Sequence, residues 1–169
     1  TATSRRWRAG TSFAASLPRD TSTDDARRHD TLRMTTANRL TITTSSAART
    51  RALGRRLAKL LRPGDIVLLQ GDLGAGKTTL AQGVGAGLKV EERVTSPTFV
   101  LLARHAGPVP LYHADLYRLT EPQEVEELAL GEQAADGVLL VEWPERAAET
   151  LPAEHLLVAI EDVDGADQR

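Results

Sequence analysis

The chain has 169 residues, a formal net charge of −2 and a hydrophobic content of 41%, which are typical values for one globular domain with a buried core. A charge this close to neutral gives no sign of an extended nucleic-acid-binding surface or a membrane-binding patch. The absence of cysteine excludes disulfides, thiolate metal sites and a cysteine nucleophile, and no apolar run approaches the roughly 18 residues that a membrane-spanning helix needs.

Residues 1–38 differ in composition from the rest of the chain. They are rich in Thr, Ser and Arg and show neither helical nor strand periodicity, so we expect them to lack a packed structure. Their composition resembles that of a transit peptide, but the aspartates and the missing amphipathic repeat argue against one. An upstream extension with Met34 as the natural start is the plainer interpretation, and a basic arm that touches RNA is the alternative. We therefore predict a disordered or non-native extension over 1–38 and one folded domain over 39–169.

From Leu40 onward, strand patterns alternate with helix patterns. Ser45 or Ser46 can cap the first helix, and 66–69 is a continuous apolar run, as expected of a strand that is buried on both faces. The predicted strands cover 40–43, 66–69, 99–104, 109–113, 138–142 and 156–160, and the predicted helices cover 45 or 46 to about 61, 78–84, 122–128 and 144–150. This alternation predicts an α/β fold with a mostly parallel central sheet and helices on both faces.

A phosphate-binding loop follows the buried strand. The segment Gly71-Asp72-Leu73-Gly74-Ala75-Gly76-Lys77-Thr78 fits the pattern G-x-x-x-x-G-K-[ST]. Its glycines allow the backbone to curl so that several N–H groups point inward at a polyphosphate, and the helix that follows adds its free N–H groups and its positive dipole end. Lys77 can reach the β and γ phosphates, and the Thr78 hydroxyl can bind Mg²⁺. We therefore predict a P-loop NTPase-like three-layer fold.

A second glycine-rich segment is Gly83-Val84-Gly85-Ala86-Gly87. It looks like part of a dinucleotide-binding fingerprint, but it follows a predicted helix, whereas that fingerprint must follow a strand. We interpret these glycines as a helix C-terminus and turn.

A carboxylate from a neighbouring strand usually completes the metal site of a P-loop. The apolar run at 138–141 ends in Glu142, which resembles a Walker-B strand with Glu in place of Asp. Asp115 is a second candidate, either for orienting the attacking water or for binding the metal through water, although a lone Asp after a strand is often a turn former. His113 lies on the same side of its strand as Asp115, and we expect it to be structural and not a metal ligand.

The hydroxyl-rich segment Thr95-Ser96-Pro97-Thr98-Phe99 precedes a predicted strand. Such a loop could sense a γ-phosphate, as switch loops do. The alternative is an ordinary proline turn that enters a strand.

Four motifs in order resemble those of the TsaE (YjeE) family, a bacterial ATPase that supports threonylcarbamoyladenosine synthesis on tRNA. The motifs are Gly71-Asp72-Leu73-Gly74-Ala75-Gly76-Lys77-Thr78-Thr79, Ser96-Pro97-Thr98-Phe99, His113-Ala114-Asp115-Leu116-Tyr117-Arg118-Leu119 and Val141-Glu142-Trp143-Pro144. The resemblance extends from about Ile42 to Glu161. Four ordered motifs are far more specific than the P-loop alone.

The resemblance implies a role for each matching residue. It implies that ATP or ADP binds to the loop 71–79 through its backbone and Lys77, and that Ser96 and Thr98 belong to a switch. It also implies that Trp143 and Thr50 lie near the nucleotide. Thr78, Glu142 and Asp115 would serve the Mg²⁺ ion. The catalytic residues would be Lys77, Glu142 and Asp115.

The resemblance also implies partners and a location. The TsaD transferase and its companion TsaB would be the protein partners, and tRNA would be reached only through their complex. The ATP cycle would support turnover of that assembly, in the cytoplasm, without DNA or membrane as a partner. This protein would not itself carry the threonylcarbamoyl group.

Two positions depart from the family pattern. The family usually has an acid just before the position of Thr50, where this chain has Arg49. The family also commonly continues into another strand, whereas this sequence stops at Asp167-Gln168-Arg169. We therefore expect altered contacts to the nucleotide base, a sheet with an incomplete edge, and the loss of any C-terminal contact to the nucleotide.

Three alternative functions share the P-loop. A small-molecule kinase usually has an Arg-rich lid over the phosphates, but outside the N-terminal segment an Arg-rich stretch occurs only in the first helix, at Arg55-Arg56. A GTPase switch usually reads guanine with an Asn-Lys-x-Asp segment, and the only asparagine is Asn38. The third alternative, a nucleotide-gated binding module with negligible turnover, is hard to distinguish by sequence from a slow ATPase.

Overall fold

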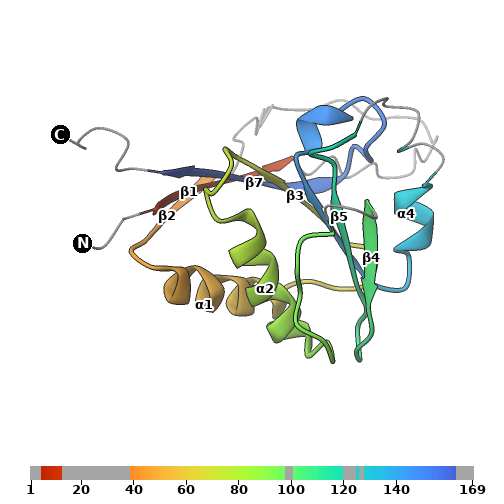
Figure 1. Ribbon diagram of the computed structural model, residues 1–169, viewed down its shortest axis with the longest axis horizontal. Helices are drawn as coiled ribbons and strands as arrows, with labels where there is room; N and C mark the ends of the chain where they lie inside the picture. The colour runs from red at the N-terminus through yellow and green to blue at the C-terminus, as the bar shows by residue number, and fades with distance from the viewer. Residues whose placement is uncertain (1–4, 13–38, 98–100, 120–124, 126–127, 163–169) are drawn as a thin grey trace, which may run out of the picture.

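A mixed β-sheet forms the centre of the protein in the computed structural model (Figure 1). The structure describes residues 5–12, 39–97, 101–119, 125 and 128–162. Its elements in chain order are β1 Arg5–Ser12, β2 Arg39–Thr44, α1 Ala47–Ala58, β3 Ile66–Gln70, α2 Lys77–Leu88, β4 Leu102–His105, β5 Leu111–Asp115, α4 Leu130–Gln133, β6 Val138–Glu142, the 3₁₀ helix η1 Pro144–Arg146, and β7 His155–Asp162. Within these ranges no helix has the length and apolar content that crossing a membrane would require.

The strand order places the predicted buried strands in the middle of the sheet. Over the described residues the order is β2-β1-β7-β3-β6-β5-β4. The four central strands β7, β3, β6 and β5 run parallel to one another, and antiparallel pairs occur at both edges. Parallel neighbours present their carboxyl ends at the same edge of a sheet. The loops that follow β3, β5 and β6 therefore meet there, and the predicted α/β fold with a mostly parallel centre is confirmed.

Side chains of the central strands contribute to two separate hydrophobic cores. Val67 and Leu69 of β3 belong to a cluster that includes residues of α1 and α2, whereas Leu68 belongs to a second cluster on the opposite face. Figure 1 shows α1 and α2 together on the first of these faces. The second cluster includes Leu130 of α4 and Ala147 just after η1. Because successive residues of a strand point to opposite faces, this arrangement confirms the three layers.

Glycines allow α1 and α2 to pack with their backbones close together. A Cβ atom on Gly83 would lie 2.3 Å from the carbonyl oxygen of Arg51, and a Cβ on Gly54 would lie 2.5 Å from that of Leu80. The prediction placed a helix C-terminus and turn at 83–87. These glycines do lie in the C-terminal half of α2, but the predicted turn was wrong, because the helix continues to Leu88. These glycines meet the neighbouring elements at distances that a side chain would not permit.

The N-terminal segment also differs from its prediction. Arg5–Ser12, which was expected to lack structure, forms β1 between β2 and β7, and its backbone pairs antiparallel with both. Backbone pairing does not depend on side-chain periodicity, which explains why this strand could not be recognised from its residue pattern. The expected open edge at β7 is likewise not observed, because β1 pairs along it. The rest of 1–38 lies outside the described residues, and the domain boundary at 38 stays a prediction.

Several other predicted elements shift at their ends. Ser46 caps α1 as predicted, with its hydroxyl accepting from the Arg49 backbone N–H at 3.3 Å, but α1 ends at Ala58 and not near 61. The strands expected over 99–104 and 109–113 are observed as Leu102–His105 and Leu111–Asp115. The helix predicted over 144–150 is only the short η1. Most of the predicted helix over 122–128 lies outside the described residues.

The contact between α1 and α2 generates a stability prediction. Gly83→Ala should lower the free energy of unfolding by about 1–3 kcal/mol, because its methyl group would overlap the α1 backbone. Ala has a higher helix propensity than Gly by about 1 kcal/mol, so a net loss would identify the clash as the larger effect. Urea denaturation measures this change. The control is Gly131→Ala in α4, where the nearest atom to a new Cβ is 3.4 Å away. Equal stability of the two variants would contradict the prediction.

Candidate functional site

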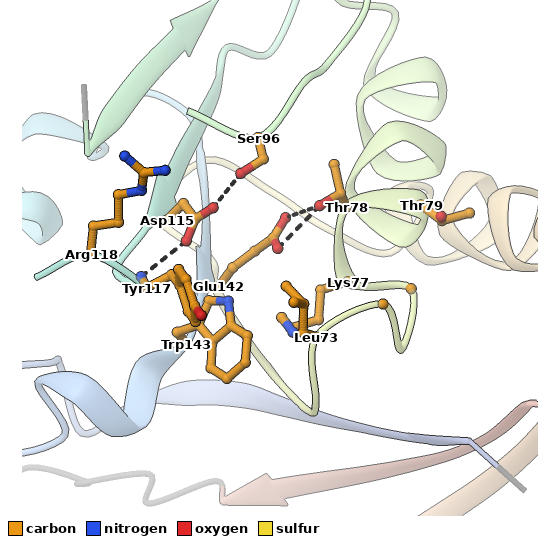
Figure 2. A pocket seen from close by; sticks show the side chains of 12 residues that line it. Leu73, Lys77, Thr78, Thr79, Ser96, Asp115, Tyr117, Arg118, Glu142 and Trp143 are labelled. Atoms are coloured by element: carbon orange, nitrogen blue, oxygen red, sulfur yellow. Dashed lines mark hydrogen bonds between the residues drawn. The ribbon is translucent and has the colours of Figure 1, made fainter. Parts of the chain in front are cut away.

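A cavity of about 380 Å³ opens where the ends of β3, β5 and β6 meet the beginning of α2 (Figure 2). Its lining contains most of the residues that the sequence singled out. The lining residues are Leu73, Gly74, Gly76, Lys77, Thr78, Thr79, Ser96, Asp115, Tyr117, Arg118, Glu142 and Trp143. Parts of four distant sequence segments thus meet in one concave site, as the parallel topology requires.

The loop between β3 and α2 curls around the side chain of Lys77. Gly71 and Gly76 adopt φ angles of +147° and +111°, in a region that residues with a side chain rarely enter. The Lys77 Nζ atom donates to the carbonyl oxygens of Gly71 at 2.6 Å and Asp72 at 2.9 Å. Helix α2 begins at Lys77 itself and has no side-chain N-cap. The free N–H groups of its first turn therefore border the cavity, which suits an anion.

The predicted metal-binding pair is in contact across the cavity. The Thr78 hydroxyl, in the first turn of α2, donates to the two carboxylate oxygens of Glu142 at 2.9 Å and 3.2 Å. Glu142 is the last residue of β6 and is only 3% exposed. These two residues are 64 positions apart in the chain. The contact arises because β6 pairs directly with β3, which leads into the loop.

Asp115 lies beside this pair at the end of β5, directly opposite Glu142 in the sheet register. One of its carboxylate oxygens accepts a hydrogen bond from the Ser96 hydroxyl, and the other accepts from the backbone N–H of Tyr117 at 3.0 Å. The second bond is the turn-forming role that a lone Asp often has. The first bond connects Asp115 to the predicted switch segment, so the turn and the site use the same carboxylate.

Trp143 closes one side of the cavity in an unusual backbone conformation. Its φ angle is +61°, which is uncommon for a bulky residue. Its backbone N–H donates to the Leu69 carbonyl at 3.3 Å, which holds the chain in place just beyond β6. The Lys77 Nζ atom lies 3.8 Å from the centroid of the indole ring, and the Tyr117 ring lies 4.9 Å from it. Backbone strain of this kind is often found at functional sites.

The Lys77 ammonium group is held in a partly desolvated environment. Burial lowers its pKa below the ordinary value of 10.5, and this effect outweighs the nearby carboxylates, which raise the pKa. Those carboxylates, in order of decreasing effect, are Glu142, Glu145, Asp115 and Asp72. Its position between backbone carbonyls and an indole face explains the desolvation.

Some predicted nucleotide contacts, namely Thr50 and the loop residues Gly71, Asp72 and Ala75, are not among the residues that line the cavity. Thr50 is fully buried in α1, where its hydroxyl shares a hydrogen bond of 2.8 Å with that of Thr44, and it does not line the cavity. Thr98 lies outside the described residues. Conversely, Tyr117 and Arg118 line the cavity and His113 contacts Glu142, although no site role was predicted for any of these three residues. The sequence feature that could have indicated the role of His113 was its position on the same strand face as Asp115.

Comparisons with known proteins agree on one family. The model of the family described as threonylcarbamoyl adenosine biosynthesis protein TsaE matches residues 44–169. A Streptomyces coelicolor protein named tRNA threonylcarbamoyladenosine biosynthesis protein TsaE is 51% identical over 120 residues, covering 68% of this chain and 80% of that protein. The Bacillus subtilis protein of the same name is 43% identical over 122 residues, covering 71% and 75%.

A solved structure is also similar. The crystal structure of Bacillus subtilis YdiB superimposes with a TM-score of 0.54 and 36% sequence identity, covering 69% of this chain and 72% of that one. This likeness and the family model support the P-loop NTPase-like fold that the sequence predicted.

The environment of Lys77 generates a prediction about proton binding. The Lys77 pKa should lie below 10.5, and Trp143→Ala should raise it toward that value by admitting water. Since the unfolded chain would hold this proton more tightly, the contribution of Lys77 to the free energy of unfolding should increase as the pH rises from the folded-state pKa to the unfolded-state value. Carbon-13 NMR of the lysine Cε atoms measures the pKa directly. Lys77→Arg assigns the signal, and a wild-type pKa of 10.5 or higher would refute the interpretation.

Proposed function

This chain belongs to the TsaE family of threonylcarbamoyl adenosine biosynthesis proteins, and from that premise we propose that it is a Mg²⁺-dependent ATPase that acts in tRNA threonylcarbamoyladenosine biosynthesis. ATP would bind with its phosphates in the loop 71–79. The observation that carries the proposal is the contact between Thr78 and Glu142 beside Lys77. It joins a hydroxyl, a carboxylate and a phosphate-binding loop in one cavity, which is the combination that P-loop ATPases use.

The residues present fit a magnesium ion. The Thr78 hydroxyl and the Glu142 carboxylate are oxygen donors, which Mg²⁺ prefers, and they are within hydrogen-bond distance of each other. Within the described ranges no group of three or more His, Cys, Asp or Glu residues could hold a metal by itself. That fits Mg²⁺, which commonly binds through one or two protein ligands together with water and substrate phosphates. When bound, the ion would neutralise charge that develops on the phosphates.

Different protein groups around the cavity would then bind the phosphates and orient the attacking water. The Lys77 ammonium and the N–H groups of the first turn of α2 would hold the β and γ phosphates. Asp115, within reach of the same cavity, would orient the attacking water. The Ser96 hydroxyl bonds to Asp115, so the position of the loop around Ser96 would control how Asp115 is presented. Coupling of this kind is typical of switch segments.

The partners that we propose are TsaD and TsaB, with tRNA reached through their complex. An ATP cycle in this protein would support turnover of the TsaD–TsaB assembly and would leave the threonylcarbamoyl transfer to TsaD. Tyr117 and Leu73 line the cavity and are exposed. A partner that docks on them would therefore contact the rim of the nucleotide site, and its binding would depend on whether nucleotide is bound. The cavity residues thereby connect nucleotide state to association.

The test of this function is Lys77→Ala. It should weaken ATP binding at least about tenfold, because hydrogen bonds to charged groups contribute about 1.5–3 kcal/mol. It should also abolish ATP-dependent co-purification with TsaD and TsaB. Lys89→Ala, which removes an exposed lysine after α2, is the matched control and should behave as wild type. Failure of the wild-type protein to associate under any nucleotide condition would reduce the assignment to a generic ATPase.

Asp115 should separate hydrolysis from binding. Asp115→Asn should lower the rate of ATP hydrolysis at least about tenfold while changing ATP affinity little, because the lost charge acts on the attacking water and not on the phosphates. Single-turnover hydrolysis and equilibrium binding measure the two effects. Asp136→Asn is the control, since Asp136 bonds to Tyr112 and does not line the cavity. Unchanged hydrolysis in Asp115→Asn would remove Asp115 from the mechanism.

A further inference from the structure

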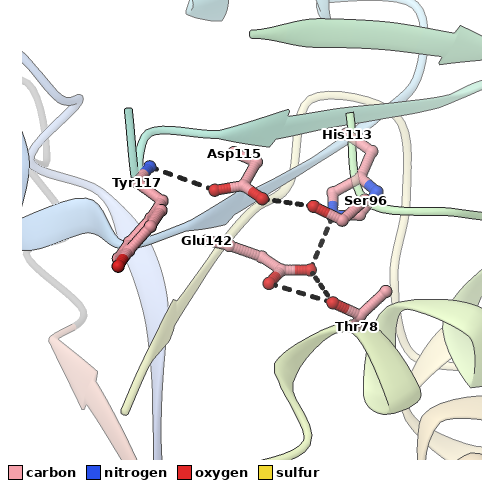
Figure 3. Close-up of polar contacts among 6 residues, drawn as sticks. All are labelled: Thr78, Ser96, His113, Asp115, Tyr117 and Glu142. Atoms are coloured by element: carbon pink, nitrogen blue, oxygen red, sulfur yellow. Dashed lines mark hydrogen bonds and ion pairs between the residues drawn. The ribbon is translucent and has the colours of Figure 1, made fainter. Parts of the chain in front are cut away.

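Glu142 has a second hydrogen-bond partner that lies inside the protein. The Nε2 atom of His113 is 3.0 Å from Glu142 Oε1, the same oxygen that receives the shorter bond from Thr78 (Figure 3). His113 is fully buried in β5, and Glu142 is 3% exposed. The Glu142 carboxylate is therefore bonded on one side to the His113 imidazole of the sheet and on the other to the Thr78 hydroxyl of helix α2.

The direction of the bond follows from the chemistry of the partners. An ionised carboxylate can only accept, so the proton of this hydrogen bond belongs to Nε2 of His113. The register of β5 and β6 explains how the Glu142 side chain reaches His113. Glu142 pairs with Asp115 and His113 pairs with Leu140, so the Glu142 side chain bends back diagonally along β6 to meet His113.

We propose that His113 is a positioning residue that fixes the Glu142 carboxylate for Mg²⁺, an inference that rests on the proposed function. The two residues project from adjacent parallel strands of the same sheet. Their contact is therefore independent of helix α2, which carries Thr78. By bonding to Oε1, His113 would hold the Glu142 carboxylate in the orientation in which it and the Thr78 hydroxyl could together bind the ion. Groups that hold a metal ligand in this way commonly change metal affinity by about 10–100-fold.

A purely structural role explains this histidine poorly. The Nδ1 atom of His113 is buried and has no hydrogen-bond partner among the residues that the structure describes, which costs stability. His113 lies on the same face of β5 as Leu111, which belongs to the core shared with α2. An aliphatic side chain would fill that position without an unsatisfied polar atom. Among the described residues the polar partner of the ring is Glu142, so the benefit of a histidine here lies in that contact.

His105 provides a natural comparison within the same region. It is 6% exposed in β4, and its ring centroid lies 6.5 Å from that of His113. Within the described part of the chain, neither of its ring nitrogens has a hydrogen-bond partner. It is thus a buried histidine of similar surroundings that does not contact Glu142, and it serves as the matched control.

The experiment measures ATP affinity with Mg²⁺ and with EDTA for each variant. His113→Leu should weaken binding about tenfold in Mg²⁺ and by less than about twofold in EDTA, because only the metal-dependent part of binding uses Glu142. His113→Gln should restore most of the affinity, since its amide N–H can reach the position of Nε2. His113→Asn, whose amide is one carbon shorter, should not. His105→Leu should leave the ratio of the two affinities unchanged.

The outcomes separate this inference from the proposed function. A wild-type protein without Mg²⁺-dependent ATP binding would overturn the proposed function and the inference with it. A wild-type protein that binds in this way, with an unchanged ratio in His113→Leu, would overturn the inference alone. Equal weakening in Mg²⁺ and EDTA would show that the role is merely structural. If His113→Leu does not fold, the difference between His113→Gln and His113→Asn decides the question.

A measurement on the protein without metal or nucleotide tests the contact itself. Nitrogen-15-edited NMR should show an Nε2–H proton of His113 that exchanges slowly with water, because the bond is buried. Glu142→Ala should remove that protection, and Asp136→Asn should not. A rapidly exchanging proton in the wild-type protein would contradict the proposed positioning.

Discussion

The parallel register of β3, β6 and β5 is the constraint on which the rest of the site depends. Leu69, Glu142 and Asp115 lie side by side across these strands. Because all three strands run in one direction, the chain leaves each of them at the same edge of the sheet. The loop after β3, the carboxylate that ends β6 and the carboxylate that ends β5 must then converge. A one-residue slip of β6 would turn Glu142 to the opposite face and separate it from Thr78.

The layer formed by α1 and α2 fixes the other side of the site. Thr78 can meet Glu142 only if α2 begins close to the end of β3 and lies flat against the sheet. Gly83 and Gly54 permit α1 to support α2 at backbone contact distance. Gly71 approaches β7 closely as well, because a Cβ there would lie 2.3 Å from the Ile160 carbonyl oxygen. The loop is therefore anchored by the sheet at its first residue and by a braced helix at its end.

The sequence could predict the parts of this site that depend on local chemistry. The glycine pattern, Lys77 and Thr78 identified the loop, and the apolar run before Glu142 identified its strand. The Walker-B-like run also placed Glu142 near Thr78, as observed. Which strands are neighbours is not a local property, so the contact of Glu142 with His113 was not derivable from spacing. The glycines of α2 were misread for a related reason. Local propensity favours a turn at 83–87, but packing against α1 makes glycine the residue that fits within a helix. Thr50 was predicted at the nucleotide, yet its hydroxyl faces Thr44 inside the protein.

The buried polar groups show where the protein gives up stability for function. Glu142, Asp115, His113 and Lys77 are all buried, and burial of charged and polar groups is unfavourable unless they are paired. Each of them has a hydrogen-bond partner. The two carboxylates accept from Thr78, Ser96 and His113, and Lys77 donates to a loop carbonyl. On the proposed function, the presence of both carboxylates and cationic groups in one cavity affects which ligand the site recognises. The two carboxylates favour the metal and repel a free polyphosphate, whereas Lys77 and the helix N-terminus favour the phosphates. On that proposal, the site would therefore suit a magnesium–nucleotide complex better than either component alone.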